Sequence, residues 1–182
     1  MLMCQGIDTD KEYCGISQYR SEKTKKLRNE SDIKLSLGAE LLLIEALKRY
    51  YPRVRIPFEI ETDRYGKPYI KGESSIHFSL AHSGAVAVCA ISDRAVGADV
   101  ERKSRVSEKI RNRYFTNKEK NYEFCYIWTR KEALLKAEGI GITAGLDTFD
   151  VSESTVIFNG NKYTLITFEP KISDYCISLA LS

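Results

Sequence analysis

The stretch Trp128–Gly139, WTRKEALLKAEG, combines the pattern of a helix with a tight group of charged side chains. Trp128, Glu132 and Lys136 recur at steps of four and therefore share nearly one helix face. The alanines and leucines between them favour a helix and give it a side to bury, and Gly139 ends it. A Glu132–Lys136 pair at i, i+4 is also a common solvated salt bridge, so these charges alone leave a purely structural role open.

The composition of the whole chain limits the classes of function. Its 182 residues are 43% apolar, which suits one large domain or two small ones, and the net charge of +3 does not indicate a strong nucleic-acid binder. No apolar run approaches the roughly 20 residues that span a bilayer, and the N-terminus lacks the pattern of a signal peptide. Five scattered cysteines without a CxxC indicate reduced thiols. We therefore expect a cytoplasmic protein that binds neither membrane nor nucleic acid.

Apolar periodicity predicts a mixed α/β (α+β) chain. Ser31–Tyr50 carries a 3.6-residue stripe with Ser31 as its N-cap, residues 118–138 form a second helical region in one or two pieces, and residues 102–113 form a basic amphipathic helix. Strands are expected at residues 2–7, 58–62, 76–80, 86–91, 96–100, 148–151, 155–158, 162–168 and 175–181. The most plausible seam, at residues 93–95, divides the chain into two halves, 1–93 and 94–182.

The segment Gly97–Glu101, GADVE, places two carboxylates close together. In a strand Asp99 and Glu101 point to the same face, where they repel each other unless a cation lies between them. Magnesium prefers such oxygen ligands, although an exposed strand edge gives the same pattern. Glu132 is a candidate third carboxylate. Lys131 and Lys136, about 140° apart around the helix, would flank it and could neutralise a diphosphate.

Several other polar residues allow two interpretations each. His82, in LAHSG, could donate to a phosphate oxygen or be a structural turn residue, and His77 fits a structural place in a strand. Lys67, in the turn GKP, could simply be solvated. Lys23 and Lys26 lie in the basic stretch SEKTKKLR, which could be a solvated helix face.

Taken in order, these motifs resemble those of one enzyme family. The matching segments are GKP (66–68), FSLAHSG (78–84), VGADVE (96–101), FTNKE (115–119) and WTRKEALLKAEG (128–139). Together they resemble the phosphopantetheinyl transferases, and the chain length resembles the two-halved type that activates surfactin synthetase. The similarity covers roughly residues 20–150, and the last motif and VGADVE in this order are far more specific than either alone.

The resemblance implies a fold and a reaction. The fold would be a monomeric pseudo-dimer of two similar α/β halves with coenzyme A in the cleft between them. The reaction would move 4′-phosphopantetheine from coenzyme A to a serine of an apo acyl or peptidyl carrier protein, with magnesium, and release adenosine 3′,5′-bisphosphate. Two rivals are a non-catalytic binding protein that keeps the cleft and a different magnesium-dependent diphosphate enzyme, such as a nucleotide hydrolase. The set of three acids and two lysines favours the transferase.

The resemblance also implies roles for residues at the matching positions. Asp99, Glu101 and Glu132 would bind magnesium, and Glu132 is also the candidate base for the serine proton. Lys131 and Lys136 would hold the diphosphate. The other implied roles are a diphosphate contact for His82, contacts with the nucleotide end and its 3′-phosphate for Lys67, Lys23 and Lys26, and pairing with Lys131 for the catalytic-motif acid Glu119.

The sequence departs from the family pattern at two places. Ala81 stands where many relatives carry serine, which removes one hydroxyl contact to phosphate. Leu35 stands where relatives often have an arginine, with Lys34 beside it as a possible substitute. The basic region 102–113 could steer an acidic carrier or be a solvated face. The sequence does not name the carrier, which could serve fatty-acid, polyketide, nonribosomal-peptide or lysine biosynthesis.

Overall fold

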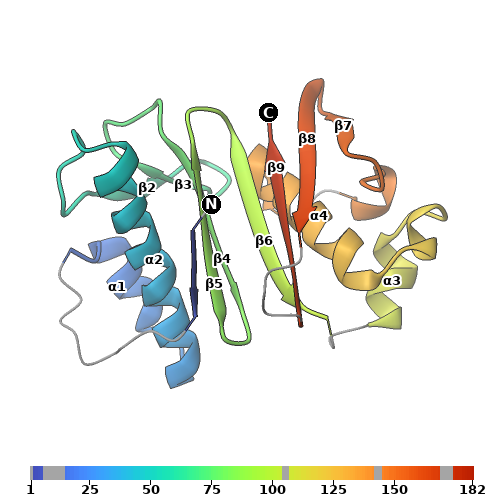
Figure 1. Cartoon of the computed structure of the whole chain (residues 1–182), viewed down its shortest axis with the longest axis horizontal. Helices are drawn as coiled ribbons and strands as arrows, with labels where there is room; N and C mark the ends of the chain where they lie inside the picture. Colours follow the sequence, from blue (N-terminus) through green and yellow to red (C-terminus); the bar gives the residue numbers. More distant parts are fainter. Residues whose placement is uncertain (1, 6–14, 104–106, 142–144, 169–173) are drawn as a thin grey trace.

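Two antiparallel sheets lie side by side in the computed structural model, each with a long helix packed on it (Figure 1). The structure describes residues 2–5, 15–103, 107–141, 145–168 and 174–182. The first sheet has the order β1-β5-β4 and the second the order β6-β9-β8-β7, and a separate hairpin pairs β2 with β3. The chain is therefore a mixed α+β protein, as the sequence predicts.

The first sheet is covered by the long helix α2. The strands are β1 (Leu2–Gln5), β4 (His77–Ser83) and β5 (Val86–Ser92), with the hairpin β2 (Ile60–Thr62) and β3 (Pro68–Ile70) beside them. Helix α2 (Glu30–Tyr50) packs on all three strands, and the short helix α1 (Gln18–Thr24) packs on α2. The predicted helix is confirmed but its cap is not Ser31, because the Asn29 side chain accepts the hydrogen bond from the Ser31 amide.

The second sheet packs on helix α4. Its strands are β6 (Val96–Arg102), β7 (Thr155–Phe158), β8 (Asn161–Phe168) and β9 (Tyr175–Leu181), and α4 runs from Phe124 to Glu138. A Cβ at Gly97 would lie 1.9 Å from the carbonyl oxygen of Ala133, so the missing side chain lets β6 approach the backbone of α4. This close contact fixes the register between the acids of β6 and the functional residues of α4.

Several predicted boundaries are corrected by backbone pairing. The expected linker 81–84 is wrong, because β4 continues through Ser83, which pairs with Val86 across a tight turn. The region 102–113 is helical only in α3 (Glu108–Tyr114), since Arg102 still pairs in β6, and residues 104–106 lie outside the described ranges. Likewise, residues 6 and 7 of the first predicted strand lie outside them.

The predicted strand at residues 148–151 is also wrong. A short 3₁₀ turn (Leu146–Thr148) occupies part of it, and another (Glu119–Asn121) precedes α4. The amide of Val151 donates to the Glu119 carboxylate at 2.9 Å, while Arg130 donates to the carbonyl of the same residue. Side chains satisfy this backbone, so it needs no neighbouring strand.

An apolar cluster joins the two sheets at their seam. It contains buried side chains of β4, β5, β6 and β9, namely Ala81, Val86, Val88, Ala90, Val96, Ala98, Val100, Tyr175 and Ile177. Strands β4 and β6 lie side by side there without pairing, and the amide of Ala98 instead donates to Ser79 Oγ at 3.0 Å. Within the described residues, no helix is long and apolar enough to cross a membrane.

Candidate active site

A cavity of about 430 Å³ lies where the two halves of the chain meet. Its walls come from α1, α2, the turn between β2 and β3, strand β4 and the second half of α4. Glu132 and Lys136 of α4 line one side, and Lys23, Lys67 and His82 line the other. The fold thus brings together five residues that the sequence predicts for the site, from segments far apart in the chain.

Trp128, Glu132 and Lys136 share one face of α4 but line two different pockets. Trp128 is half-buried, its ring stacks on that of Phe124 at 6.0 Å, and both line a smaller pocket of about 100 Å³. Glu101 lines that smaller pocket, whereas Glu132 and Lys136 line the larger one. The acids of the predicted metal site therefore lie between two hollows.

Asp99 is a buried carboxylate with only one oxygen satisfied. Its Oδ1 accepts from Lys136 Nζ at 2.6 Å, while Oδ2 has no hydrogen-bond partner. Burial raises the pKa of Asp99 above its usual range, although Lys136 opposes the shift. The folded protein thus holds an incompletely compensated negative group at this position.

Glu132 and Glu101 extend this acidic cluster. Glu132 Oε1 is buried without a hydrogen-bond partner, and burial together with the charge of Asp99 raises the pKa of Glu132 to about 7. Glu101 accepts a hydrogen bond from Ser83 Oγ at 2.9 Å and also raises the pKa values of the other two acids. Among the side chains described, no group of three or more His, Cys, Asp or Glu residues is already gathered as a metal site. What is present is a set of oxygen donors with two unsatisfied buried atoms, which is the chemistry that a hard divalent cation fits.

Replacing Glu132 by glutamine should stabilise the metal-free protein above neutral pH. A raised carboxyl pKa means that the folded state holds the proton more tightly than the unfolded chain, so stability is lost as the pH rises from about 4.5 through about 7. Chemical denaturation in EDTA at several pH values should show a flatter pH dependence for Glu132→Gln, with a gain of about 1–3 kcal/mol at pH 8. Glu138 is unsuitable as a control because it is only half-exposed and its carboxylate accepts from Asn159 and Tyr163, so the exposed Glu45→Gln on α2 serves instead. Parallel pH curves for Glu132→Gln and the wild type would contradict the expectation.

Positive side chains gather on the opposite wall. Burial lowers the pKa of His82. The positive charges of Arg20, Lys136 and Lys23 lower this pKa further, whereas the negative charge of Asp32 opposes the shift. Burial likewise lowers the pKa of Lys23, with further contributions from Arg20 and Lys136. Because cations of both walls act on each other in this way, the cavity between them favours an anionic ligand.

Of the two predicted basic residues Lys67 and Lys26, only Lys67 lines the cavity. Lys67 lines the cavity and its Nζ donates to the carbonyl of Ala137 at 2.5 Å, in the last turn of α4, and burial lowers its pKa. It therefore ties the β2–β3 turn to the helix that carries Glu132. Lys26 is exposed and does not line the cavity, so its nucleotide contact stays a prediction.

Lys131 is also not in the cavity. Its side chain is 0% exposed, and its Nζ lies 2.9 Å from Glu119 and donates to the carbonyls of Leu146 and Phe149. Burial lowers the pKa of Lys131 although Glu119 opposes the shift. The predicted Glu119–Lys131 pair is present and fully buried, and neither residue lines the cavity. The diphosphate contact of Lys131 and the catalytic role of Glu119 stay predictions. Both fasten α4 to the loop after it.

Substitution of Lys131 by methionine tests whether this lysine stabilises the fold or binds the nucleotide. It should leave the Glu119 carboxylate buried without its cation and lower the free energy of unfolding by about 3–5 kcal/mol. Urea denaturation measures the loss. Lys118→Met, which breaks the exposed pair with Glu153, should cost less than about 1 kcal/mol. Unchanged stability with weakened nucleotide binding would restore Lys131 to the site.

Ala81 and Leu35, the two residues that depart from the family pattern, both make apolar contacts. Ala81 is buried in the cluster at the seam and borders the cavity, where it offers no hydroxyl. Leu35 is buried against Ala39 and Ala87. Lys34 pairs with Glu30 at 2.7 Å and does not line the cavity, and its role in place of the missing arginine stays a prediction.

The sequence did not identify Arg20 as a site residue. Arg20 lies in α1, is buried, and lines the cavity, where its Nε bonds to the fully buried Glu40 of α2. The only signal was a glutamate on the apolar side of a helix, since Glu40 stands among Ala39, Leu43 and Ile44. A buried acid of this kind needs a basic partner.

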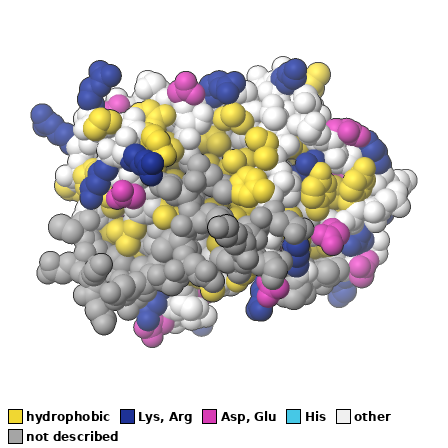
Figure 2. Space-filling view, viewed as in Figure 1, with side chains coloured by type: hydrophobic (Ala, Val, Ile, Leu, Met, Phe, Trp, Pro, Cys, Tyr) yellow, Lys and Arg dark blue, Asp and Glu magenta, His cyan; other side chains and the backbone are white. Residues whose placement is uncertain are grey.

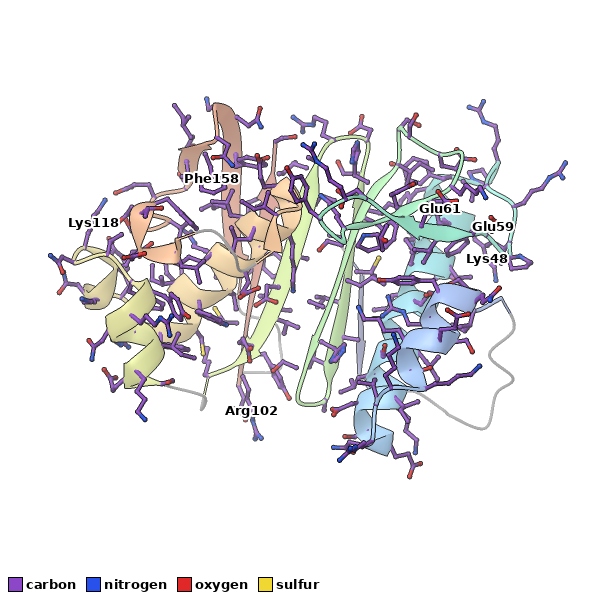
Figure 3. All side chains as sticks on the ribbon, turned by 180° about the vertical axis from the view of Figure 1, so that it is seen from behind. Lys48, Glu59, Glu61, Arg102, Lys118 and Phe158 are labelled. Carbon is purple, nitrogen blue, oxygen red and sulfur yellow. The ribbon has the colours of Figure 1, made fainter. Side chains whose placement is uncertain are left out.

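The basic region after β6 is not one continuous positive face. Arg111 of α3 points inward, where its Nη1 donates to the carbonyls of Lys120 and Tyr122. Arg102, at the far end of β6, and Lys118 project from separate parts of the second half (Figure 3). On the face shown in Figure 2, lysine and arginine side chains lie around the edges among acidic ones. A role of this region in steering an acidic carrier stays a prediction.

Comparisons with known proteins agree with the geometry of the cavity. A sequence model described as the 4′-phosphopantetheinyl transferase superfamily matches residues 95–180. The chain is 32% identical over 176 residues to the 4′-phosphopantetheinyl transferase gsp of Aneurinibacillus migulanus, covering 86% of this chain and 72% of that protein. It is 29% identical over 147 residues to the 4′-phosphopantetheinyl transferase Sfp of Bacillus subtilis strain 168, covering 75% and 66%. The chain thus spans about two thirds of the length of these relatives. On this similarity, it belongs to the 4′-phosphopantetheinyl transferase superfamily.

Proposed function

We propose that this protein transfers 4′-phosphopantetheine from coenzyme A to a serine of an apo acyl or peptidyl carrier protein and releases adenosine 3′,5′-bisphosphate. The observation that carries the proposal is the cavity between the halves, with buried acids and Lys136 on one wall and cations on the other. Its relatives bear the name of this activity. A substrate with a diphosphate and a further phosphate suits such a charge distribution.

The nucleotide part of coenzyme A would lie against the wall built by α1, β4 and the β2–β3 turn. Lys23, Lys67 and His82 all line this wall and provide donors for phosphate oxygens. Lys136 would face the diphosphate from α4, where it already neutralises part of Asp99. The ligand phosphates would therefore take over the role of counter-charge for these cations.

Asp99, Glu101 and Glu132 would hold a magnesium ion. The two buried oxygens without partners, on Asp99 and Glu132, are the observation that supports this, since an unsatisfied buried carboxylate oxygen is costly. A bound divalent cation would neutralise the diphosphate and make its phosphorus easier to attack. Glu101 would need to keep or exchange its hydrogen bond from Ser83.

The chain's own residues would then position the reaction. The serine oxygen of the carrier forms a bond to the phosphorus that carries pantetheine, and the bond from that phosphorus to the bridging oxygen breaks. The bridging oxygen and its electron pair leave with adenosine 3′,5′-bisphosphate. The serine proton would pass to Glu132, whose carboxylate borders the cavity. Lys136 would stabilise the charge that develops on the leaving group.

We also propose that the two halves, 1–93 and 94–182, form a pseudo-dimer. Each half has an antiparallel sheet packed on one long helix, α2 or α4, which supports a pseudo-dimer with the active site at its seam. A single chain then supplies both walls of the cavity, so a cytoplasmic monomer would be sufficient for activity.

Mass spectrometry of a panel of apo carriers tests the proposal. With coenzyme A and magnesium, at least one fatty-acid, polyketide, nonribosomal-peptide or aminoadipate-type carrier should gain the mass of one phosphopantetheine, and replacing its serine by alanine should abolish the gain. Binding of coenzyme A without transfer to any carrier would favour the non-catalytic rival. Release of adenosine 3′,5′-bisphosphate without a carrier would favour the hydrolase.

A further inference from the structure

The wall built by α1 and α2 contains a buried carboxylate that the proposed chemistry does not use. Glu40 of α2 is 0% exposed, and both of its oxygens are occupied. Oε1 accepts from the amide of Ser17 at 2.6 Å, and Oε2 accepts from Arg20 Nε at 3.0 Å. Glu40 thus holds one particular edge of the Arg20 side chain, across the boundary between two helices.

Arg20 is fixed on two sides and directed at the cavity. Besides the Glu40 bond, its Nη1 donates to Ser36 Oγ at 3.1 Å, and its own amide is capped by Ser17 Oγ at 3.2 Å. A guanidinium has five N–H donors in a rigid fork. No hydrogen bond from Nη2 is found in the described part of the chain, although Arg20 and Ser36 both line the cavity. One edge of the fork is therefore left for a ligand.

The surroundings of this edge favour an anion. Arg20 contributes to the lowered pKa values of both Lys23 and His82, so its positive charge acts in the cavity despite the Glu40 pair. The direction of the guanidinium matters as much as its charge, because a planar fork binds a phosphate well only when its free N–H groups face the oxygens. An unrestrained arginine would lose this direction.

We propose that Glu40 is a positioning residue, which holds Arg20 so that its free guanidinium edge contacts a phosphate group of the bound nucleotide. This inference rests on the proposed function, because it takes the ligand to be an adenine nucleotide. Two phosphates have the same chemistry here, the phosphomonoester on the ribose and the diphosphate. Three hydrogen bonds carry the inference: Ser17 to Glu40, Arg20 to Glu40 and Arg20 to Ser36.

Calorimetric titration of Glu40→Gln in EDTA tests the inference. The glutamine keeps the size of the side chain but loses the charge and one of the two acceptor oxygens. The probes are adenosine 3′,5′-bisphosphate, adenosine 5′-diphosphate and adenosine. We expect a loss of affinity of about tenfold or more for at least one phosphorylated probe, with adenosine unchanged. Arg20→Lys should give the same loss, because lysine keeps the charge but not the fork. Glu45→Gln, on the exposed side of the same helix, should change nothing.

The pattern of losses decides the result. A loss limited to adenosine 3′,5′-bisphosphate indicates that Arg20 contacts the phosphate on the ribose. A loss limited to adenosine 5′-diphosphate indicates that Arg20 contacts the diphosphate. Either result supports the inference. No loss, or an equal loss for all three probes including adenosine, overturns it and leaves a purely structural ion pair. If Glu40→Gln does not fold, Arg20→Lys and Ser36→Ala are judged by the same rule. If the wild type binds none of the probes, the proposed function itself fails and the inference fails with it; wild-type binding with unchanged variants overturns only the inference.

Discussion

Asp99→Asn is expected to reduce phosphopantetheine transfer by at least about a hundredfold to a thousandfold without unfolding the protein. Asn is nearly isosteric with Asp, and its oxygen can still accept from Lys136. Because burial raises the pKa of Asp99, the metal-free fold gains little from its charge, so stability should stay equal or rise. Single-turnover transfer to a carrier measures the first effect and thermal unfolding in EDTA the second.

The same variant also tests the metal site without an activity assay. Magnesium should raise the melting temperature of the wild type, since a ligand that binds only the folded state stabilises it, and Asp99→Asn should remove most of that rise. Asp93→Asn, at an exposed turn residue just before β6, is the matched control. Transfer close to the wild-type rate would exclude Asp99 from the site. Unfolding of the metal-free variant would instead show that the carboxylate stabilises the fold.

The sequence located the acids and α4 well because their contacts follow from local periodicity. Asp99 and Glu101 lie on one face of a strand, and Glu132 and Lys136 lie on one face of a helix. It could not show that β6 meets α4 so closely, since that depends on Gly97 packing on Ala133. The register of that contact places Lys136 beside Asp99.

Lys131 is a motif residue whose burial was not predicted from the sequence. On a helix its neighbours at i−4, i+3 and i+4 are Ile127, Leu134 and Leu135, all buried, so Lys131 lies on the core side of α4. The prediction for Lys131 followed the family motif, which assigns it to the diphosphate, and did not weigh these apolar neighbours, which favour burial. Only its acid partner, Glu119, could not be located by periodicity, because it comes from the turn before the helix.

The contacts that the sequence missed are non-local or depend on backbone pairing. Arg20 and Glu40 are 20 residues apart and meet only because α1 folds back on α2. His82 was assigned to a turn because of the glycine that follows Ser83, but its pairing with Ala87 continues the ladder. Short-range signals do not show where a strand pair stops when small polar residues precede the turn.

Lys136→Met should have the opposite effect on stability from Asp99→Asn. Methionine fills the space of the lysine stem but leaves Asp99 buried with neither oxygen paired to a cation. The Lys136 side chain is about one third exposed, so the cost is smaller than for a fully buried pair, and we expect a loss of about 1–3 kcal/mol in EDTA. The double variant Asp99→Asn/Lys136→Met should recover most of this loss, because the buried charge of Asp99 is then removed together with its counter-ion.

Urea denaturation of the two single variants, the double variant and the wild type measures the coupling, and coenzyme A titration measures the function of the same lysine. Lys136→Met should weaken coenzyme A binding at least about tenfold, whereas Lys34→Met, at an exposed pair with Glu30, should affect neither quantity. If the double variant is as unstable as Lys136→Met alone, the lysine stabilises α4 by its packing and not by compensating Asp99. If stability falls as expected but coenzyme A binding is unchanged, Lys136 serves the acid and not the substrate. The two measurements together separate the counter-ion role of Lys136 from its ligand role, which its position between Asp99 and the cavity allows it to combine.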